Sequence, residues 1–193
     1  MKWVLFFILG LYNVKIESNP SAVCINYRNV SVQTEKVALD QGNFIRLSIN
    51  GEAGVSNEIG KPDLPVIRKL IEIPYNGEAK VSVKVKKFYT LKITAPVYPV
   101  QPPRPKIKDA QIEFAWDKRA YKVNAFVPDY VVHIADEVKW RGHHLVQVEI
   151  YPVAYNPVTQ ELKVYKDFDA VSYTHLRAHE TEAELVCRLL LEK

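Results

Sequence analysis

Few side chains in this sequence have the type and spacing that catalysis requires. Cys24 carries a thiol that becomes a nucleophile only beside a base, and His143 or His144 would be the bases available. Cys24 lies near the start of the chain, where a preorganised site is not expected, so an inert cysteine is favoured. His143 and His144 are adjacent and would point to opposite faces of a strand, which makes joint metal binding difficult. We therefore expect an exposed histidine pair on a hairpin turn.

Carboxylates give only a weak metal signal. Asp167 and Asp169 are two residues apart, so on a strand they share a face and could bind calcium. Without a glycine-rich loop beside them, a solvated strand edge is the favoured interpretation. His133, between two aliphatic residues, is expected at one outward position of a strand. The sequence predicts no metal site and no cofactor.

Basic residues form a third group with two interpretations. Lys80, Lys84 and Lys86 alternate along one expected strand, which is typical of a soluble surface with protected edges. Alternatively, a basic residue on a loop mimics the substrate of a protease with an acidic specificity pocket, or marks a processing site; the candidates are Arg104, Lys118 and Arg119. The net charge of +4 is small and aromatic residues are not interleaved with the cations, so nucleic acid is not an expected partner.

The elements that would position these residues have a period of two. Apolar side chains alternate with polar ones in several short runs, which predicts half-buried antiparallel strands. The apolar positions are Ile45, Leu47 and Ile49; Val81, Val83 and Val85; Val146, Val148 and Ile150; and Leu162 and Val164. Turn signals lie at Asn50-Gly51, Asn76-Gly77, Arg141-Gly142 and Asn156-Pro157. With no persuasive helix, these patterns predict an all-β fold, an antiparallel, jelly-roll-like β-sandwich.

One segment departs from this pattern. Residues 96–105 contain five prolines in ten residues, which favours extended polyproline geometry and argues against a central strand. We expect a stiff crossover between the two halves of the sandwich.

Both ends of the chain are expected to lie outside the domain. Lys2 followed by a short apolar run predicts a secretory signal peptide over residues 1–22. Residues 171–193 resemble one reading frame of a sequencing-library adapter, although the leucines of this segment also have helical spacing. The predicted domain therefore covers residues 23–170, and we expect no membrane contact once the signal peptide is removed.

Two motif blocks carry a family resemblance. The first comprises Gly60, Pro62, Leu64 and Pro65, then Ile73 and Pro74 at the end of an apolar strand; the second comprises Tyr155, Asn156 and Pro157 before the last alternating strand. In this order, behind a signal peptide, they resemble the gingipain propeptide family. The resemblance covers residues 30 to 170 and implies a β-sandwich prodomain, truncated at its C-terminus.

The resemblance also implies a function. Such a prodomain precedes a caspase-like cysteine endopeptidase, assists its folding, covers its active cleft during export and is then cleaved off. The expected partner is the cognate catalytic domain in cis, whose histidine and cysteine lie downstream of this chain. The fragment itself is expected not to be an enzyme, and its expected location is secreted, extracellular or at the cell surface.

Two alternatives come from other classes of protein. A stand-alone secreted binding module, for carbohydrate or adhesion, would need an exposed aromatic platform; its candidates are Tyr89, Tyr98, Trp116 and Trp140. A structural domain of a larger surface protein would need no site. The reading frame beyond Ala170 separates these alternatives from a peptidase precursor, because only the precursor encodes a histidine and a later cysteine nucleophile.

Overall fold

The computed structural model describes residues 13–19, 22–50, 53–103 and 113–176. The described residues form strands and one short 3-10 helix, which confirms the all-β class. The strands are β1 (Asn13–Asn19), β2 (Ala22–Arg28), β3 (Val32–Leu39), β4 (Gly42–Ile49), β5 (Ile67–Ile73), β6 (Gly77–Lys92), β7 (Val132–Trp140), β8 (His143–Ile150), β9 (Val153–Asn156) and β10 (Glu161–Leu176), and the helix is η1 (Ala120–Lys122). No helix among them is long and apolar enough to cross a membrane.

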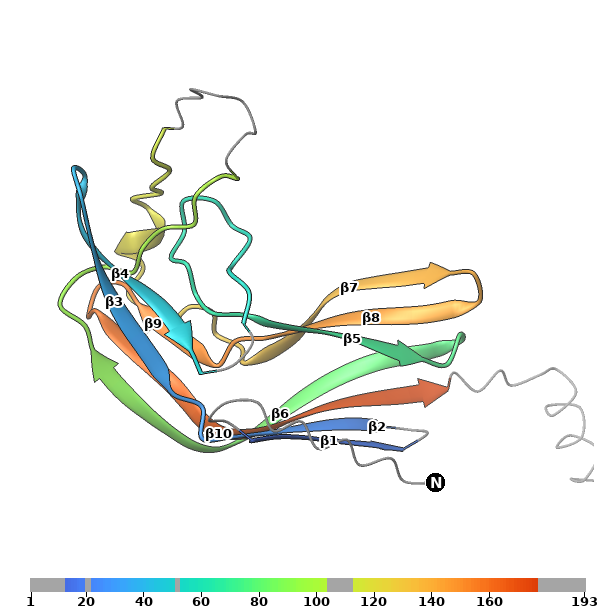
Figure 1. Cartoon of the computed structure of the whole chain (residues 1–193). Coiled ribbons are helices and arrows are strands. Elements are labelled where there is room, and N and C mark those ends of the chain that lie inside the picture. Colours follow the sequence, from blue (N-terminus) through green and yellow to red (C-terminus); the bar gives the residue numbers. More distant parts are fainter. Residues whose placement is uncertain (1–12, 20–21, 51–52, 104–112, 177–193) are drawn as a thin grey trace, which may run out of the picture.

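The strands form two packed layers and a separate hairpin. One sheet has the order β1-β2-β10-β6, with β9 also paired to β10; the other has the order β5-β8-β7; β3 and β4 pair with each other. All pairs of strands are antiparallel. Figure 1 shows β7, β8 and β5 lying over β6, β10, β2 and β1, as in a sandwich.

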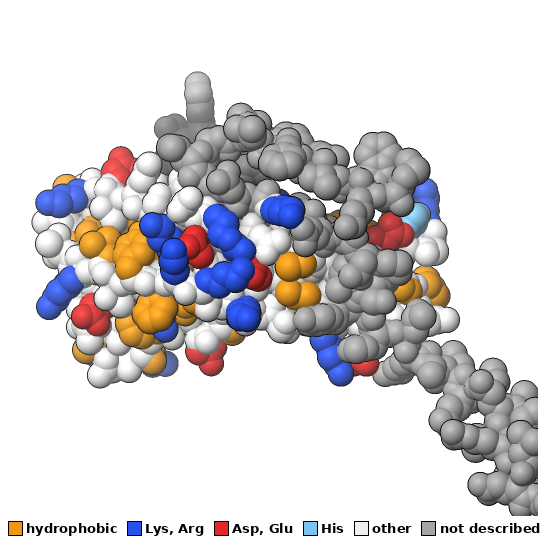
Figure 2. Space-filling view, turned by 90° about the horizontal axis from the view of Figure 1, so that it is seen from below, with side chains coloured by type: hydrophobic (Ala, Val, Ile, Leu, Met, Phe, Trp, Pro, Cys, Tyr) orange, Lys and Arg blue, Asp and Glu red, His pale blue; other side chains and the backbone are white. Residues whose placement is uncertain are grey.

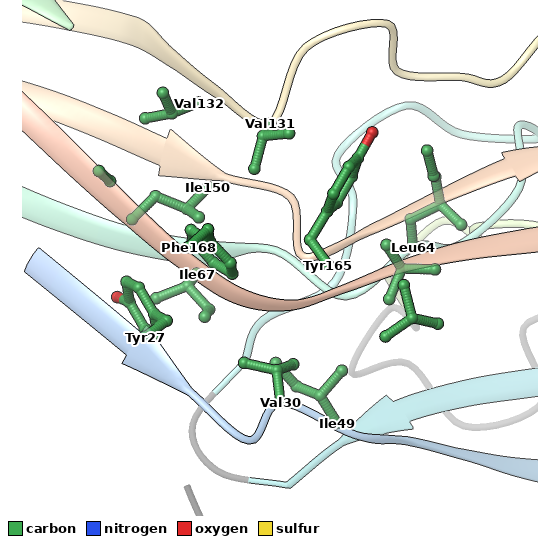
Figure 3. Packing of buried hydrophobic residues seen from close by; sticks show 14 of the residues in the cluster. Tyr27, Val30, Ile49, Leu64, Ile67, Val131, Val132, Ile150, Tyr165 and Phe168 are labelled. Carbon is green, nitrogen blue, oxygen red and sulfur yellow. The ribbon is translucent and has the colours of Figure 1, made fainter. Parts of the chain in front are cut away.

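Alternating side chains of the two sheets meet in one core. Val146, Val148 and Ile150 of β8 are buried, as their spacing predicted. Ile67 of β5 lies beside Ile150 and faces Phe168 and Tyr27 of the opposite sheet (Figure 3). Burial of such aliphatic side chains contributes about 1.5–3 kcal/mol each, which is the main force joining the layers.

Several turns and surface positions follow the sequence prediction. Arg141 and Gly142 have positive φ angles in the tight turn between β7 and β8, and Asn76 precedes Gly77 in the turn between β5 and β6. Asn156-Pro157 begins the turn between β9 and β10, whereas Gly51 lies outside the described residues. The lysines at alternate positions of β6 are exposed on the outermost described strand of their sheet, where charge discourages pairing with another chain.

The described part of the proline-rich segment is extended and is not a strand, but it makes isolated bridges to its neighbours. It runs between β4 and the loop before β5 and forms backbone hydrogen bonds with both. The Tyr98 N–H donates to the Ile45 carbonyl at 2.7 Å, while the Tyr98 carbonyl accepts from the Asp63 N–H at 2.8 Å. Val100 N–H likewise donates to Lys61 at 2.9 Å. Residues 96–103 form no strand, as the prolines predicted, and their few hydrogen bonds use the N–H groups of non-proline residues.

Two elements cross the boundaries predicted for the domain. β1 lies within the predicted signal region and pairs with β2 along its whole length. β10 continues beyond Ala170, and residues as far as Leu176 pair with β6. The division at residues 22 and 170 stays a prediction.

Candidate functional site

A cleft of about 590 Å³ opens at the end of the sandwich that carries the long loops. Three segments form its walls: the loop before β5, the stretch from Asp117 through η1 to Tyr130, and the region around β9. Its lining is mostly apolar and aromatic, with charged side chains at Glu58, Lys61, Asp117, Arg119 and Asp129. Such a cleft, with few polar groups in an apolar lining, is typical of a binding site.

The two motif blocks, almost a hundred residues apart, meet in this cleft. Pro62 and Leu64 of the first block and Tyr155 and Pro157 of the second line it. Tyr155 is held by two backbone hydrogen bonds to Val127, at 2.9 and 3.0 Å. The motif residues therefore contribute to two of the three walls of the site.

Gly60 explains why the first block begins with glycine. Its φ is +82°, a left-handed conformation that side chains disfavour. A Cβ atom at this position would lie 3.0 Å from the Asp117 backbone nitrogen. The Gly60 carbonyl accepts a hydrogen bond from the Asp117 N–H at 3.0 Å, and the Gly60 N–H donates to Val100 at 2.8 Å. Gly60 thus joins the loop before β5 to the segment that leads into η1.

The remaining motif residues have structural partners. Pro65 and Ile73 are buried, and the Pro74 carbonyl lies 3.2 Å from Nδ1 of His144. Asn156 is also buried, and its Oδ1 accepts hydrogen bonds from the N–H groups of Val158 and Thr159 at 3.1 and 3.3 Å. These residues fix the ends of β5 and the turn before β10 rather than line the cleft.

Two of the three basic candidates lie beside the cleft. Lys118 and Arg119 are exposed in the turn before η1, and Arg119 contributes to the cleft lining. The Arg119 N–H donates to the Asp117 carboxylate at 2.9 Å, and the Lys118 ammonium lies 5.6 Å from the centre of the Trp116 ring. Arg104 lies outside the described residues.

Tyrosines make the walls of the cleft and of its neighbourhood rigid. The Tyr121 hydroxyl donates to the Val97 carbonyl at 2.6 Å, and burial raises the pKa of Tyr121. The Tyr151 hydroxyl donates to Glu149 at 3.0 Å; burial first, and then this hydrogen bond, raise the pKa of Tyr151. Both phenols therefore stay neutral donors around neutral pH.

The lining of the cleft, within the described part of the chain, holds no histidine or cysteine. Nor do the described residues contain a group of three or more His, Cys, Asp or Glu side chains suited to a metal ion. The geometry of the cleft is suited to binding a partner.

The structure does not bring the thiol and the histidines into a catalytic arrangement. Cys24 is a half-buried residue of β2 whose sulfur lies 3.8 Å from Oδ1 of Asn26. His143 is exposed, with Nδ1 2.7 Å from the Glu72 carboxylate. His144 is fully buried and bonds to the carboxylate of Glu137, so the expectation of an exposed pair was wrong for this residue. Both histidines belong to β8, and only the preceding Arg141-Gly142 forms the turn.

Asp167 and Asp169 lie on a central strand, which corrects the expected solvated edge. β10 pairs with β2 on one side and β6 on the other. Asp169 bonds to Arg28 and Lys86, both at 2.6 Å. Asp167 accepts from the Asn29 N–H at 2.9 Å. Figure 2 shows this face, where lysine and arginine side chains surround the acidic ones. These cations occupy the place that a calcium ion would need.

This network predicts a pH dependence of folding. Partial burial acts to raise the pKa of Asp169, but the hydrogen bonds and charges of Lys86 and Arg28 outweigh it, so the pKa lies below its ordinary value. The resulting stability is complete above the unfolded-state pKa and is lost as pH falls through the folded-state pKa. Asp169→Asn should therefore cost about 1 kcal/mol at pH 7 and clearly less at pH 3, measured by urea unfolding.

Glu35→Gln is the control for this prediction. Glu35 is exposed and lies 4.0 Å from Arg46, so its substitution should change the free energy of unfolding little at either pH. An equal loss for Asp169→Asn at both pH values would contradict the role of the charge.

Sequence reasoning missed one buried polar network. Glu149 was expected on a wet face, yet it is 7% exposed. It bonds to Nε of Arg68 at 2.8 Å and lies 3.8 Å from His133, which stands on the outer face as expected. Nothing in the alternating pattern distinguishes a covered carboxylate from a solvated one. Arg68 lies directly opposite Glu149 on the neighbouring strand, and this pairing predicts an ion pair only once the strand register is known.

The aromatic platform required of a binding module does not form from its candidates. Tyr98 and Trp116 both pack against Phe44, with ring centres 6.0 and 5.2 Å from it. Trp140 ends β7 and has the Arg141 guanidinium 4.5 Å from its ring centre. Half of the candidate rings therefore contribute to an internal cluster.

Comparison with known proteins gives a consistent result. The family model Propeptide_C25 matches residues 13–185. Lys-gingipain HG66 and Lys-gingipain W83 of Porphyromonas gingivalis are 31% and 30% identical over 143 residues, which is 72% of this chain. The chain spans only 8% of the length of these relatives.

Solved structures share the fold. A structure on the zymogenic latency of gingipain K from P. gingivalis has a TM-score of 0.71 at 23% identity, covering 90% of this chain and 98% of that one. A complex of the pro- and mature domains of RgpB from P. gingivalis gives 0.72 at 20% identity, covering 91% and 93%. The family match and the fold agree with the two motif blocks, and the chain belongs to the Propeptide_C25 family as a gingipain propeptide domain that is not itself catalytic.

Proposed function

We propose that this domain keeps a gingipain-like cysteine endopeptidase latent and assists its folding within one secreted precursor. The peptidase domain is the partner in cis, and residues 1–22 act as the signal peptide. Residues 23–170 are then the functional propeptide, and residues 171–193 have no selected role.

The cleft is the observation that carries this proposal. It joins both motif blocks in one apolar surface and displays Arg119, with Lys118 beside it, at an exposed turn. A basic side chain at such a position suits an acidic specificity pocket. Two structural neighbours concern the same role in their own proteins, since one addresses zymogenic latency and the other is a complex of pro- and mature domains.

The test uses the full 193-residue chain and the peptidase domain of the same gene. The chain should inhibit that domain in a dose-dependent manner and hydrolyse nothing itself. Alanine substitution of one of Arg104, Lys118 and Arg119 should raise the inhibition constant at least about tenfold, as loss of a central charged anchor does.

Lys84→Ala is the matched control, because Lys84 is an exposed lysine of β6, a strand that contributes no residue to the cleft lining. It should leave the inhibition constant within about twofold. Absence of a histidine and a later cysteine nucleophile in the reading frame, or absence of inhibition by the wild-type chain, would overturn the proposal.

A further inference from the structure

The outer face of the β5-β8-β7 sheet carries apolar side chains where water would favour polar ones. Leu70, Val138 and Trp140 are 65%, 47% and 59% exposed, and Leu145 is half-buried. All four belong to the set of alternate residues that points away from the core, because Val146 and Val148 of the central strand are buried. We call Leu70, Val138, Leu145 and Trp140 the outer patch.

The register makes the outer patch continuous across the three strands. Val138 lies directly opposite Leu145, and Trp140 lies opposite His143. Leu70, on the third strand, is opposite Gln147, the next outward residue of β8 after Leu145. Directly opposite and diagonal neighbours on one face are within side-chain reach. The patch is therefore one surface rather than scattered exposed residues.

Charged and polar groups surround the outer patch. Glu72 and His143 pair at 2.7 Å beside it, and the Arg141 guanidinium covers one side of the Trp140 ring. An apolar centre with a polar rim is the usual composition of a protein-protein interface. Contiguous exposed apolar surface on a soluble domain is itself a sign of an interaction site.

A row of polar side chains on the same face links the outer patch to the cleft. Tyr130 and Tyr151 line the cleft, and their ring centres lie 4.4 and 6.1 Å from that of His133 on the outer face. His133 is opposite Glu149, whose partner Arg68 is two residues from Leu70 on the same strand. Figure 1 shows the loop before β5 and the segment around η1 rising on the side of the molecule away from β1 and β2, which is also the side of β7 and β8. One partner can therefore contact both surfaces at once.

The size of a stable interface selects the partner. A stable complex buries about 800 Å² on each partner, contributed by 20–30 residues. The cleft and the basic turn on its rim offer less surface than this, so a stable complex needs a further contact surface. We propose that the outer patch is a second docking surface for the peptidase domain of the same precursor; this rests on the proposed function. The cleft and its turn supply specificity, while the outer patch supplies affinity through apolar burial.

The test measures binding of the full chain to the separately produced peptidase domain by calorimetry. Leu70→Ser and Trp140→Ser should each raise the dissociation constant at least about tenfold. Their melting temperatures should match the wild-type value, because both side chains are largely exposed. In the unmodified chain, hydrogen exchange along β7, an outer strand of its sheet, should slow when the peptidase domain binds.

Phe88→Ser and Leu39→Ser are matched controls, since these side chains are 57% and 37% exposed and belong to β6 and β3. Both should bind like the wild-type chain. If the wild-type chain binds while the patch variants bind equally tightly and exchange in β7 is unchanged, the second docking surface is refuted and the proposed function stands. If the wild-type chain does not bind at all, both proposals fail together.

Discussion

Replacing Phe168 with alanine is expected to lower the free energy of unfolding by about 3–5 kcal/mol. Phe168 is fully buried, and its ring stacks on Tyr27 with the centres 4.9 Å apart. It lies at the point where β10 pairs with Tyr27 of β2 and Val85 of β6. The cavity would therefore open where three strands meet, and it would remove a large share of the 5–15 kcal/mol typical of a domain. Urea unfolding followed by circular dichroism measures the loss.

Phe88→Ala is the control for this prediction. Phe88 is 57% exposed on β6, so its removal should change the free energy of unfolding by less than about 0.5 kcal/mol. Equal losses for the two phenylalanines would show that the centre of the core lies elsewhere.

Arg68→Ala is expected to cost about 2 kcal/mol, because it leaves the buried Glu149 carboxylate without its charged partner. The side chain of Glu149 is 9% exposed and that of Arg68 is 29% exposed, so solvent screens part of the loss. The Tyr151 hydroxyl still donates to Glu149 and offsets another part. The measurement is again the free energy of unfolding at pH 7.

A double variant tests the cause. Arg68→Leu with Glu149→Leu removes both charges and should recover much of the loss, since the desolvated carboxylate is gone. Glu35→Ala is the control, because the Glu35 side chain is 73% exposed and its ion pair with Arg46, at 4.0 Å, should contribute little. A double variant as unstable as Arg68→Ala would indicate that packing of the arginine stem, rather than charge, matters here.

The fold could be predicted from the sequence because its strands have one buried face and one solvent-exposed face, so apolar and polar residues alternate. Val146, Val148 and Ile150 are buried, as their period of two predicts. The Arg141-Gly142 turn precedes them in the chain, where the sequence predicted a turn. His144 is on the same buried face, but a histidine gives no hydrophobic signal there. Its burial depends on the Pro74 carbonyl and Glu137, which come from other parts of the fold.

The candidate site could be predicted only in part. The motif residues were identified, but their spacing does not show that Leu64 and Tyr155 share a cleft; this depends on the pairing of Val127 with Tyr155. The partners of the proline-rich segment could not be predicted for a related reason. Local geometry argues against pairing, whereas Tyr98 and Val100 find partners only after β4 and the loop before β5 are in place.

The position of β10 has a consequence for how the chain acquires its structure. It is the last described strand, yet it joins β2, β6 and β9 to one another. A chain that emerges N-terminus first, from a ribosome or a translocation pore, lacks the strand that closes the layer until about 160 residues have appeared. β2, β6 and β9 cannot join into one sheet before β10 has appeared, although β1-β2, β3-β4 and β5-β8-β7 can pair earlier, so the first layer of the sandwich is completed late.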